Sequence, residues 1–237
     1  MVLDDVSVRF VAGSLTVVVG RSGVGKTTLL HALVGLLRPV GGVVRVAGMG
    51  ELGAPAVLQA HRERTATIFQ DHALIDRLSA LENVKLGLAD RRHPLAFWPW
   101  PRRIEWRAAE ALAEVGLLHR AHAPVGRLSG GERQRVGVAR ALARDARLIL
   151  GDEPFSALDP PMAAELGEKL RRVARERGTT VILVLHQLDL ALALADRIVG
   201  LADGHVGFDG PVSEFDQSAR RRVFGAGPWP LPAGASR

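Results

Sequence analysis

Three glycines, a lysine and two threonines share residues 20–28, and this combination suits the binding of an anion. The glycines let the backbone curl so that successive N–H groups point at phosphate oxygens, and a helix beginning near Lys26 adds its positive N-terminal partial charge. Lys26 supplies a full charge for the β- and γ-phosphates, and the Thr27 hydroxyl can ligate Mg²⁺. An ordinary glycine turn is the alternative, but the pattern G-x-x-x-x-G-K-[ST] favours a nucleoside triphosphate site. The expected contact residues are Gly20, Arg21, Ser22, Gly23, Gly25, Lys26, Thr27 and Thr28.

Two neighbouring carboxylates, Asp152 and Glu153, follow the apolar segment 147–151. Ligand sites of parallel sheets form at the carboxyl ends of the strands, so an apolar strand would deliver both groups there. Asp152 is then placed to hold Mg²⁺, and Glu153 to polarise an attacking water. Alone, such a pair is more often a solvated turn, but the phosphate loop favours the catalytic interpretation.

Two further polar residues follow expected strands. His186 comes after residues 181–185 and could hydrogen-bond a γ-phosphate, and Gln70 comes after residues 65–69 and could reach the Mg²⁺ or the water. A lone histidine after a strand is usually structural or exposed, and a glutamine in a loop is often just exposed. We predict catalytic roles for both and a metal-binding role for Gln70.

A second helix terminus suited to anions begins at Ser129. Ser129 is a good N-cap, and Gly130 and Gly131 expose the first helical N–H groups. One chain with two such termini but a single phosphate loop suggests that two copies pair head to tail. The second terminus of one copy would then cover the γ-phosphate held by the other.

The elements that must position these residues alternate between strand and helix, which predicts a mainly parallel sheet covered by helices, with a helical insertion at about 71–145. Residues 1–217 would form one domain and residues 218–237 a basic, Gly/Pro-rich C-terminal tail. Strands are expected at 15–19, 43–47, 65–69, 147–151, 180–185, 197–202 and 206–208, and helices at 26–37, 161–177 and 188–195.

The composition excludes several classes of protein. The chain has 237 residues and no cysteine, so disulfides and thiolate metal sites are excluded. No apolar run approaches the ~20 residues needed to cross a bilayer, and we expect no secretory signal. The net charge of +6 is carried mostly by scattered arginines, which indicates solvated surface and no nucleic-acid partner.

In their order along the chain, these motifs resemble those of the ATP-binding cassette family. The resemblance covers nearly the whole sequence. It rests on the phosphate loop, Gln70, residues 128–134, the acidic strand end, residues 156–159 and His186.

The resemblance implies a P-loop NTPase fold of the ABC-ATPase type, in which the mainly parallel core carries a β subdomain and the inserted α-helical subdomain. It also implies a homodimer with ATP and Mg²⁺ sandwiched at its interface, where residues 129–131 act in trans and Asp159 links the two sites. ATP binding would close the dimer and hydrolysis at Glu153 would reopen it. Gln70 and the helical insertion would pass this motion to membrane-spanning permease subunits, on the cytoplasmic face of the inner membrane.

Segments 71–83, 185–192 and 196–211 are similar to those of the phosphonate importer ATPases, and the loop 94–101 lies where that subgroup carries aromatic residues. This implies a bacterial importer for phosphonate or a related phosphorus oxyanion, served indirectly by an extracytoplasmic substrate-binding protein. A transport ATPase for another cargo, such as an amino acid or a lipoprotein, and a non-transport cassette protein are the alternatives. The cargo would never touch this subunit, so its residues do not encode the cargo directly.

The N-terminal segment departs from the family pattern, and the tryptophans of the helical insertion have two possible roles. Family members begin with a strand whose aromatic ring stacks on adenine, whereas residues 3–8 here already resemble the strand before the phosphate loop, and Phe10 lies too far along. Either the true start lies upstream or adenine is held without that ring, so we expect modest ATP affinity. Trp98, Trp100 and Trp106 either pack the helical insertion or form an exposed patch against the permease or the membrane.

Overall fold

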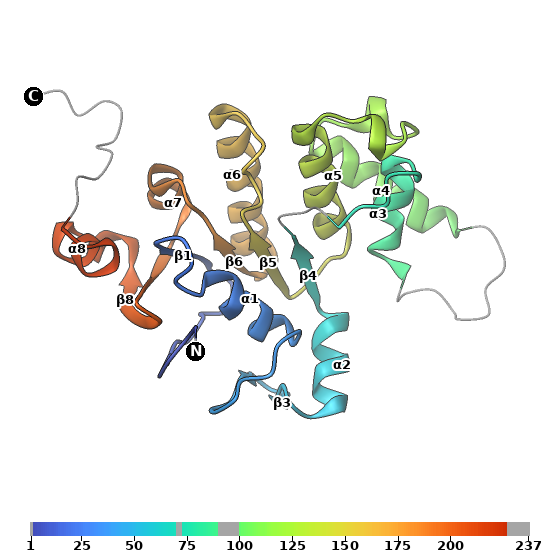
Figure 1. The fold of residues 1–237 in the computed structure, drawn as a ribbon. Coiled ribbons are helices and arrows are strands. Elements are labelled where there is room, and N and C mark those ends of the chain that lie inside the picture. Colours follow the sequence, from blue (N-terminus) through green and yellow to red (C-terminus); the bar gives the residue numbers. More distant parts are fainter. Residues whose placement is uncertain (1, 70–72, 90–99, 227–237) are drawn as a thin grey trace, which may run out of the picture.

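The centre of the molecule is a six-stranded sheet in the order β4-β5-β6-β1-β7-β8 (Figure 1). The computed structural model describes residues 2–69, 73–89 and 100–226. All neighbouring strands run parallel except β7 and β8, which pair antiparallel. The predicted mainly parallel α/β fold is therefore confirmed. The strands are β1 Leu15–Gly20, β4 Thr65–Ile68, β5 Leu148–Asp152, β6 Thr180–Val184, β7 Arg197–Ala202 and β8 His205–Pro211.

Each face of the sheet has its own hydrophobic core. On β1, Val17 and Val19 join the larger core with α6, α7 and α8, whereas Val18 joins the smaller core with α1. Because helices cover both faces, the strands read as continuous apolar runs in the sequence rather than as alternating patterns. These helices are α1 Lys26–Val34, α6 Pro160–Arg177, α7 Leu188–Leu194 and α8 Gln217–Phe224.

A separate group of helices is inserted between β4 and β5 and stands to one side of the sheet (Figure 1). Two of its helices begin with a capping box, Ser79 with Glu82 on α3 and Ser129 with Glu132 on α5. Each box satisfies backbone N–H groups that the first helical turn leaves open. The group consists of α3 Ala80–Leu86, α4 Arg102–Glu114, α5 Gly130–Ala143 and the 3-10 helices η2 Leu118–Arg120 and η3 Val125–Arg127.

The region between α1 and β4 differs from the expectation in three respects. α1 ends at Val34 rather than near residue 37, because Gly35 takes the left-handed conformation with φ 75°. The strand expected at 43–47 shrinks to β2, Arg45–Val46, which pairs only with the short β3, Gly50–Glu51. The helix α2, Pro55–Glu63, was not expected, although a proline at the first helical position is a start signal.

The C-terminal helix α8 packs against the sheet instead of belonging to a tail. Its Ala219 and Val223 are buried in the larger core, and the Asp216 side chain caps its first turn by accepting from the Ala219 N–H. The packed domain therefore continues to Phe224, beyond the expected boundary at residue 217. The amphipathic spacing of the segment, rather than its composition, places it in the packed domain, because the helix buries two apolar side chains among its arginines.

Residues 2–10 lie over the smaller core, with a bend at Asp5, where φ is 45°. The Asp4 N–H donates to the Gly204 carbonyl oxygen at 2.9 Å, and Val6, Val8 and Phe10 pack partly buried against that core. Phe10 is thus used in packing. Among the helices of residues 2–69, 73–89 and 100–226, none is long and apolar enough to cross a membrane.

Candidate functional site

The loop between β1 and α1 wraps around the ammonium group of Lys26. Nζ donates to the carbonyl oxygens of Gly20 and Arg21, each at 2.9 Å, and the side chain is only 5% exposed. Gly20 has φ 152°, and a Cβ there would lie 2.5 Å from the Leu201 carbonyl oxygen, so only glycine fits. Gly23 and Gly25 also have positive φ. The sequence therefore places the lysine at the centre of a loop whose backbone requires glycine at these positions.

The N-terminus of α1 carries no side-chain cap. Gly25 precedes the helix in the left-handed conformation and makes no side-chain hydrogen bond to it, so the first N–H groups stay available for an anion. Thr27 and the loop residues Arg21 and Ser22 are exposed, and Thr28 is half-buried. All of the expected phosphate contacts thus lie in one loop and the start of the helix that follows it.

Asp152 ends β5 with its carboxylate almost buried. It is 7% exposed, and within the described part of the chain its Oδ1 is fully buried without a hydrogen-bond partner. A buried carboxylate oxygen without a donor suits a bound cation. In residues 2–69, 73–89 and 100–226, no cluster of three or more His, Asp or Glu could hold a metal alone. Mg²⁺ would therefore need Asp152, Thr27 and oxygens from its phosphate ligand.

Glu153 and His186 meet at the ends of the adjacent strands β5 and β6. His186 Nε2 lies 2.6 Å from Glu153 Oε1, and the Glu153 N–H donates to the Val184 carbonyl at 3.1 Å. Glu153 has φ 48°, a left-handed conformation that costs a non-glycine residue about 1–2 kcal/mol. Such strain persists at sites where the surroundings hold a side chain in place.

The carboxylates of Asp152 and Glu153 also affect the pKa of Lys26 electrostatically. Burial lowers the pKa of the Lys26 ammonium, and the negative charges of Glu153 and Asp152 oppose that shift. The two carboxylates at the end of β5 and the loop after β1 therefore share one electrostatic environment. The structure brings these three residues and His186 together at one edge of the sheet.

The second helix terminus belongs to α5 in the inserted group. Ser129 Oγ accepts from the Glu132 N–H at 3.2 Å, and the Glu132 carboxylate accepts from the Ser129 N–H at 2.8 Å. The hydrogen bond from the Ser129 N–H to the carboxylate lowers the pKa of Glu132. Ser129 and Gly130 are exposed and Gly131 is half-buried. No hydrogen bond within the described residues joins this terminus to the phosphate loop of the same chain.

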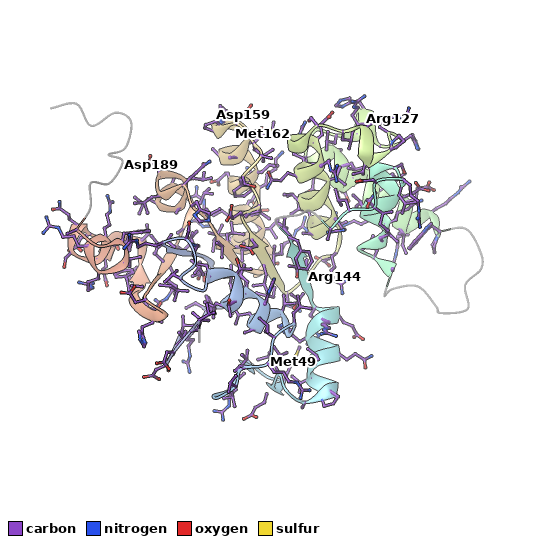
Figure 2. All side chains as sticks on the ribbon, in the orientation of Figure 1. Met49, Arg127, Arg144, Asp159, Met162 and Asp189 are labelled. Atoms are coloured by element: carbon purple, nitrogen blue, oxygen red, sulfur yellow. The ribbon has the colours of Figure 1, made fainter. Side chains whose placement is uncertain are left out.

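Asp159 caps α6 on the same side of the molecule as the end of the inserted group. Its carboxylate accepts from the Met162 N–H at 2.9 Å, and the residue is exposed. Figure 2 shows Asp159 and Met162 at the tip of α6, with Arg127 of the inserted group on the same upper side. The capping role explains the local choice of aspartate and leaves one carboxylate oxygen for other contacts.

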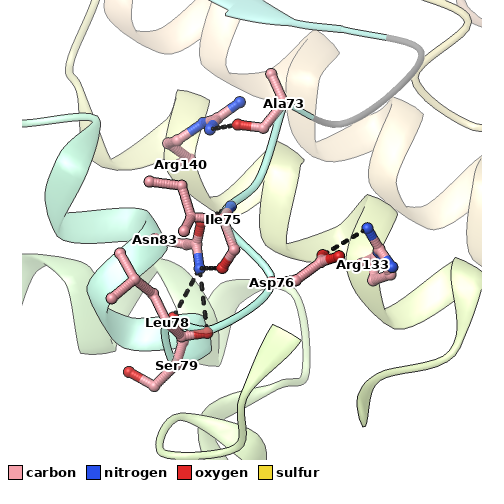
Figure 3. Close-up of polar contacts among 8 residues, drawn as sticks. All are labelled: Ala73, Ile75, Asp76, Leu78, Ser79, Asn83, Arg133 and Arg140. Carbon is pink, nitrogen blue, oxygen red and sulfur yellow. Dashed lines mark hydrogen bonds and ion pairs between the residues drawn. The ribbon is translucent and has the colours of Figure 1, made fainter. Parts of the chain in front are cut away.

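Gln70 lies outside the described residues, but the segment that follows it is tightly held. Arg140 donates to the Ala73 carbonyl at 2.6 Å, and Arg133 forms an ion pair with Asp76 at 2.8 Å (Figure 3). Asn83 is completely buried and bonds to the backbone of the same segment. Sequence reasoning missed Asn83, whose signal was a polar residue next to the buried positions of α3.

A cleft of about 390 Å³ separates β4 and α1 from the inserted helices. Trp100, beyond this cleft, packs partly buried against the larger core, with Lys85 Nζ 5.9 Å from its ring centroid. Trp106 on α4 is 70% exposed, and Trp98 lies outside the described residues. The tryptophans are therefore divided between packing and surface. The cleft is lined by residues that include Arg62, Thr67, Phe69, Leu86, Arg140 and Arg144.

Comparison with known proteins shows which family the chain belongs to. The family model described as ABC transporter matches residues 3–156. A phosphonates import ATP-binding protein, PhnC 2 of Rhodopseudomonas palustris, is 57% identical, covering 94% of this chain and 78% of the relative. The phosphite import ATP-binding protein PxtA of Stutzerimonas stutzeri is 45% identical, covering 98% of this chain and 85% of the relative.

Solved structures give the same result. The dimeric post-hydrolysis state of the ATP-binding cassette MJ0796, bound to ADP and Pi, matches with a TM-score of 0.81 and 31% identity over 89% of this chain and 90% of that one. CbiO1 of Clostridium perfringens, part of the transporter complex cbiONQ, matches with a TM-score of 0.77 and 26% identity over 94% and 87% of the two chains. The chain belongs to the ABC transporter family, as one of its ATP-hydrolysing cassettes.

Proposed function

We propose that two copies of this chain bind Mg-ATP between them and use its hydrolysis to power import of a phosphonate or a related phosphorus oxyanion through a separate permease. The observation that supports the catalytic part of the proposal is that Lys26, Asp152, Glu153 and His186 lie together at the carboxyl ends of the strands. The relatives named for phosphonate and phosphite import support the cargo.

Each residue of the site has a role in this proposal. Lys26 and the N–H groups of the loop 20–28 hold the phosphates, and Thr27, Asp152 and Gln70 hold Mg²⁺, which neutralises charge on the phosphates when bound. Glu153 accepts a proton from the attacking water, whose oxygen bonds to the γ-phosphorus as the bond to the ADP oxygen breaks. His186 holds the Glu153 carboxylate in place and is positioned to contact the γ-phosphate.

The paired state follows from the separation of the two anion-binding termini. The α5 terminus at residues 129–131 would face the γ-phosphate on the other copy, and Asp159 on the same side would link the two sites. The dimeric structure of MJ0796 supports this arrangement. We place the dimer on the cytoplasmic face of the inner membrane, with the cleft beside β4 facing the permease.

The cargo distinguishes this proposal from its main alternative, an ATPase for a different nutrient. Because the cargo passes through the permease, a substrate-binding protein outside the membrane would select it. The decisive experiment measures uptake of labelled methylphosphonate under phosphate starvation in cells with the gene, without it, and carrying Glu153→Gln. Labelled phosphite is tested as the related cargo, and labelled phosphate and an amino acid serve as controls.

Loss of methylphosphonate or phosphite uptake in both mutant strains, with phosphate and amino acid uptake unchanged, supports the proposal. Unchanged uptake of both phosphorus compounds would overturn the cargo assignment. Normal uptake with Glu153→Gln but none without the gene would overturn the catalytic role of Glu153 instead.

A further inference from the structure

Gln134 on α5 has a polar side chain that is completely buried. Its Nε2 donates to the backbone carbonyl of Glu153 at 2.8 Å and lies 3.4 Å from Ser156 Oγ, and its Oε1 accepts from the Ala157 N–H at 2.7 Å. One amide therefore donates to the first residue of a turn and accepts from its last. An amide can do both, because it carries a donor and an acceptor at its tip.

The turn that Gln134 spans contains the residue proposed as catalytic base. Glu153 is held in a left-handed conformation with φ 48°, its N–H bonded to Val184 on β6 and its carbonyl bonded to Gln134. The two bonds fix the peptide groups on either side of its Cα. The direction of the Glu153 side chain toward His186 therefore depends on where α5 stands.

The start of α5 packs on the same turn. A Cβ added to Gly131 would lie 3.1 Å from the Ala157 carbonyl oxygen, and one added to Gly130 would lie 3.7 Å from the Ala157 Cβ. The glycines thus allow the terminus proposed to contact the partner's ATP to approach this turn closely. A shift of the terminus on nucleotide binding would move Gln134 with it, because both belong to one helix.

We propose that Gln134 is a positioning residue that aims the Glu153 carboxylate and ties its position to the helix terminus at residues 129–131. The inference rests on the proposed function. It predicts that hydrolysis, rather than ATP binding, is sensitive to the Gln134 amide. A side chain that only filled the core would affect folding but not the turnover of the folded protein.

The test compares Gln134→Glu and Gln134→Met with the wild-type chain. Glutamate keeps the shape but sets an oxygen against the Glu153 carbonyl, and methionine removes both hydrogen bonds. We expect kcat per folded molecule to fall about 10- to 100-fold, while the Kd for ATPγS changes less than about twofold. Gln217→Glu, an exposed position at the start of α8, is the matched control and should leave both values unchanged.

A double-mutant cycle separates positioning from other effects. In a Glu153→Gln background the residual turnover should change less than about twofold when Gln134 is also replaced, because the group that it aims is already gone. A full additional loss in that background, or an unchanged kcat in both single variants, would overturn the inference. A wild-type chain without ATPase activity would overturn the proposed function itself.

If neither variant folds, hydrogen exchange in the wild-type protein provides the test. The Ala157 amide, which donates to Gln134, should exchange at a rate that changes at least about fivefold when ATPγS binds. An exchange rate unaffected by ATPγS would overturn the link between the helix terminus and the turn.

Discussion

Asn83 holds the segment after β4 through hydrogen bonds to its backbone, and it offers a sharp test of how this segment is stabilised. Its Oδ1 accepts from the Ile75 N–H at 2.8 Å (Figure 3). Its Nδ2 donates to the carbonyl oxygens of Ile75, Ser79 and Leu78 at 3.1, 3.0 and 3.4 Å. The side chain is completely buried, so any group that loses its bond has little access to water.

The informative change is Asn83→Leu, which keeps the branched shape of the side chain and removes all of these bonds. An unsatisfied buried group costs about 1–3 kcal/mol, and the Ile75 N–H would lose the acceptor that Asn83 provides while at least one carbonyl loses its donor. We therefore expect the free energy of unfolding to fall by about 3 kcal/mol. For a domain of this size that corresponds to a melting temperature lower by about 6–12 °C.

Urea and thermal unfolding followed by circular dichroism measure this effect. Gln59→Leu on the exposed face of α2 is the control and should change the free energy of unfolding by less than about 0.5 kcal/mol. A change below about 0.5 kcal/mol for Asn83→Leu would refute the reasoning, because it would mean that the segment does not need these bonds.

Four further results are expected. Glu153→Gln should lower phosphate release at least about 100-fold and leave an ATP-bound dimer visible by gel filtration. Lys26→Ala should weaken ATP binding at least about tenfold in titration calorimetry while the chain still folds. Hydrogen bonds to the Glu132 carboxylate depress its pKa below 4.5. Glu132 therefore stabilises the fold above that pH, and this contribution is lost as the pH falls further, so Glu132→Gln should flatten acid unfolding curves. Trp106→Ser should leave the melting temperature within about 2 °C of wild type, since its ring is exposed, whereas Trp100→Ser should lower it by more.

The sequence predicted the parts of the molecule whose information is local. The phosphate loop combines a strand, glycines and a helix start within one short segment, and the strands β5 and β6 are apolar runs that end in chemically distinct residues. Each of these features is determined by residues that lie close together in the sequence. The helix α2 was missed because its apolar pattern is weak, with His61 its only buried residue in the described part of the chain.

The residues to which sequence reasoning gave no role act through backbone groups outside their own helices. Gln134 bonds to residues 19 to 23 positions along the chain, and Asn83 bonds to a loop before its own helix. Nothing in the sequence specifies which carbonyl or N–H will face a buried amide. The one usable signal is a polar side chain in line with the buried stripe of a helix, as Gln134 is with Val138 and Leu142.

The arrangement of α5 supports the proposal that a second copy takes part in the chemistry. Within one chain, α5 is fixed to the turn after Glu153 by Gln134 and by the close approach of Gly131, so its terminus cannot swing toward the phosphate loop of the same chain without disturbing the catalytic carboxylate. Ser129 and Gly130 are exposed, and among the described residues the side-chain hydrogen bonds of this terminus are those of its capping box and one from Arg120 Nε to the Glu132 carboxylate. A phosphate group on another copy can therefore reach the free N–H groups without breaking any bond in this one. Closure of the dimer and placement of Glu153 would then be parts of a single movement, because the same rigid helix takes part in both.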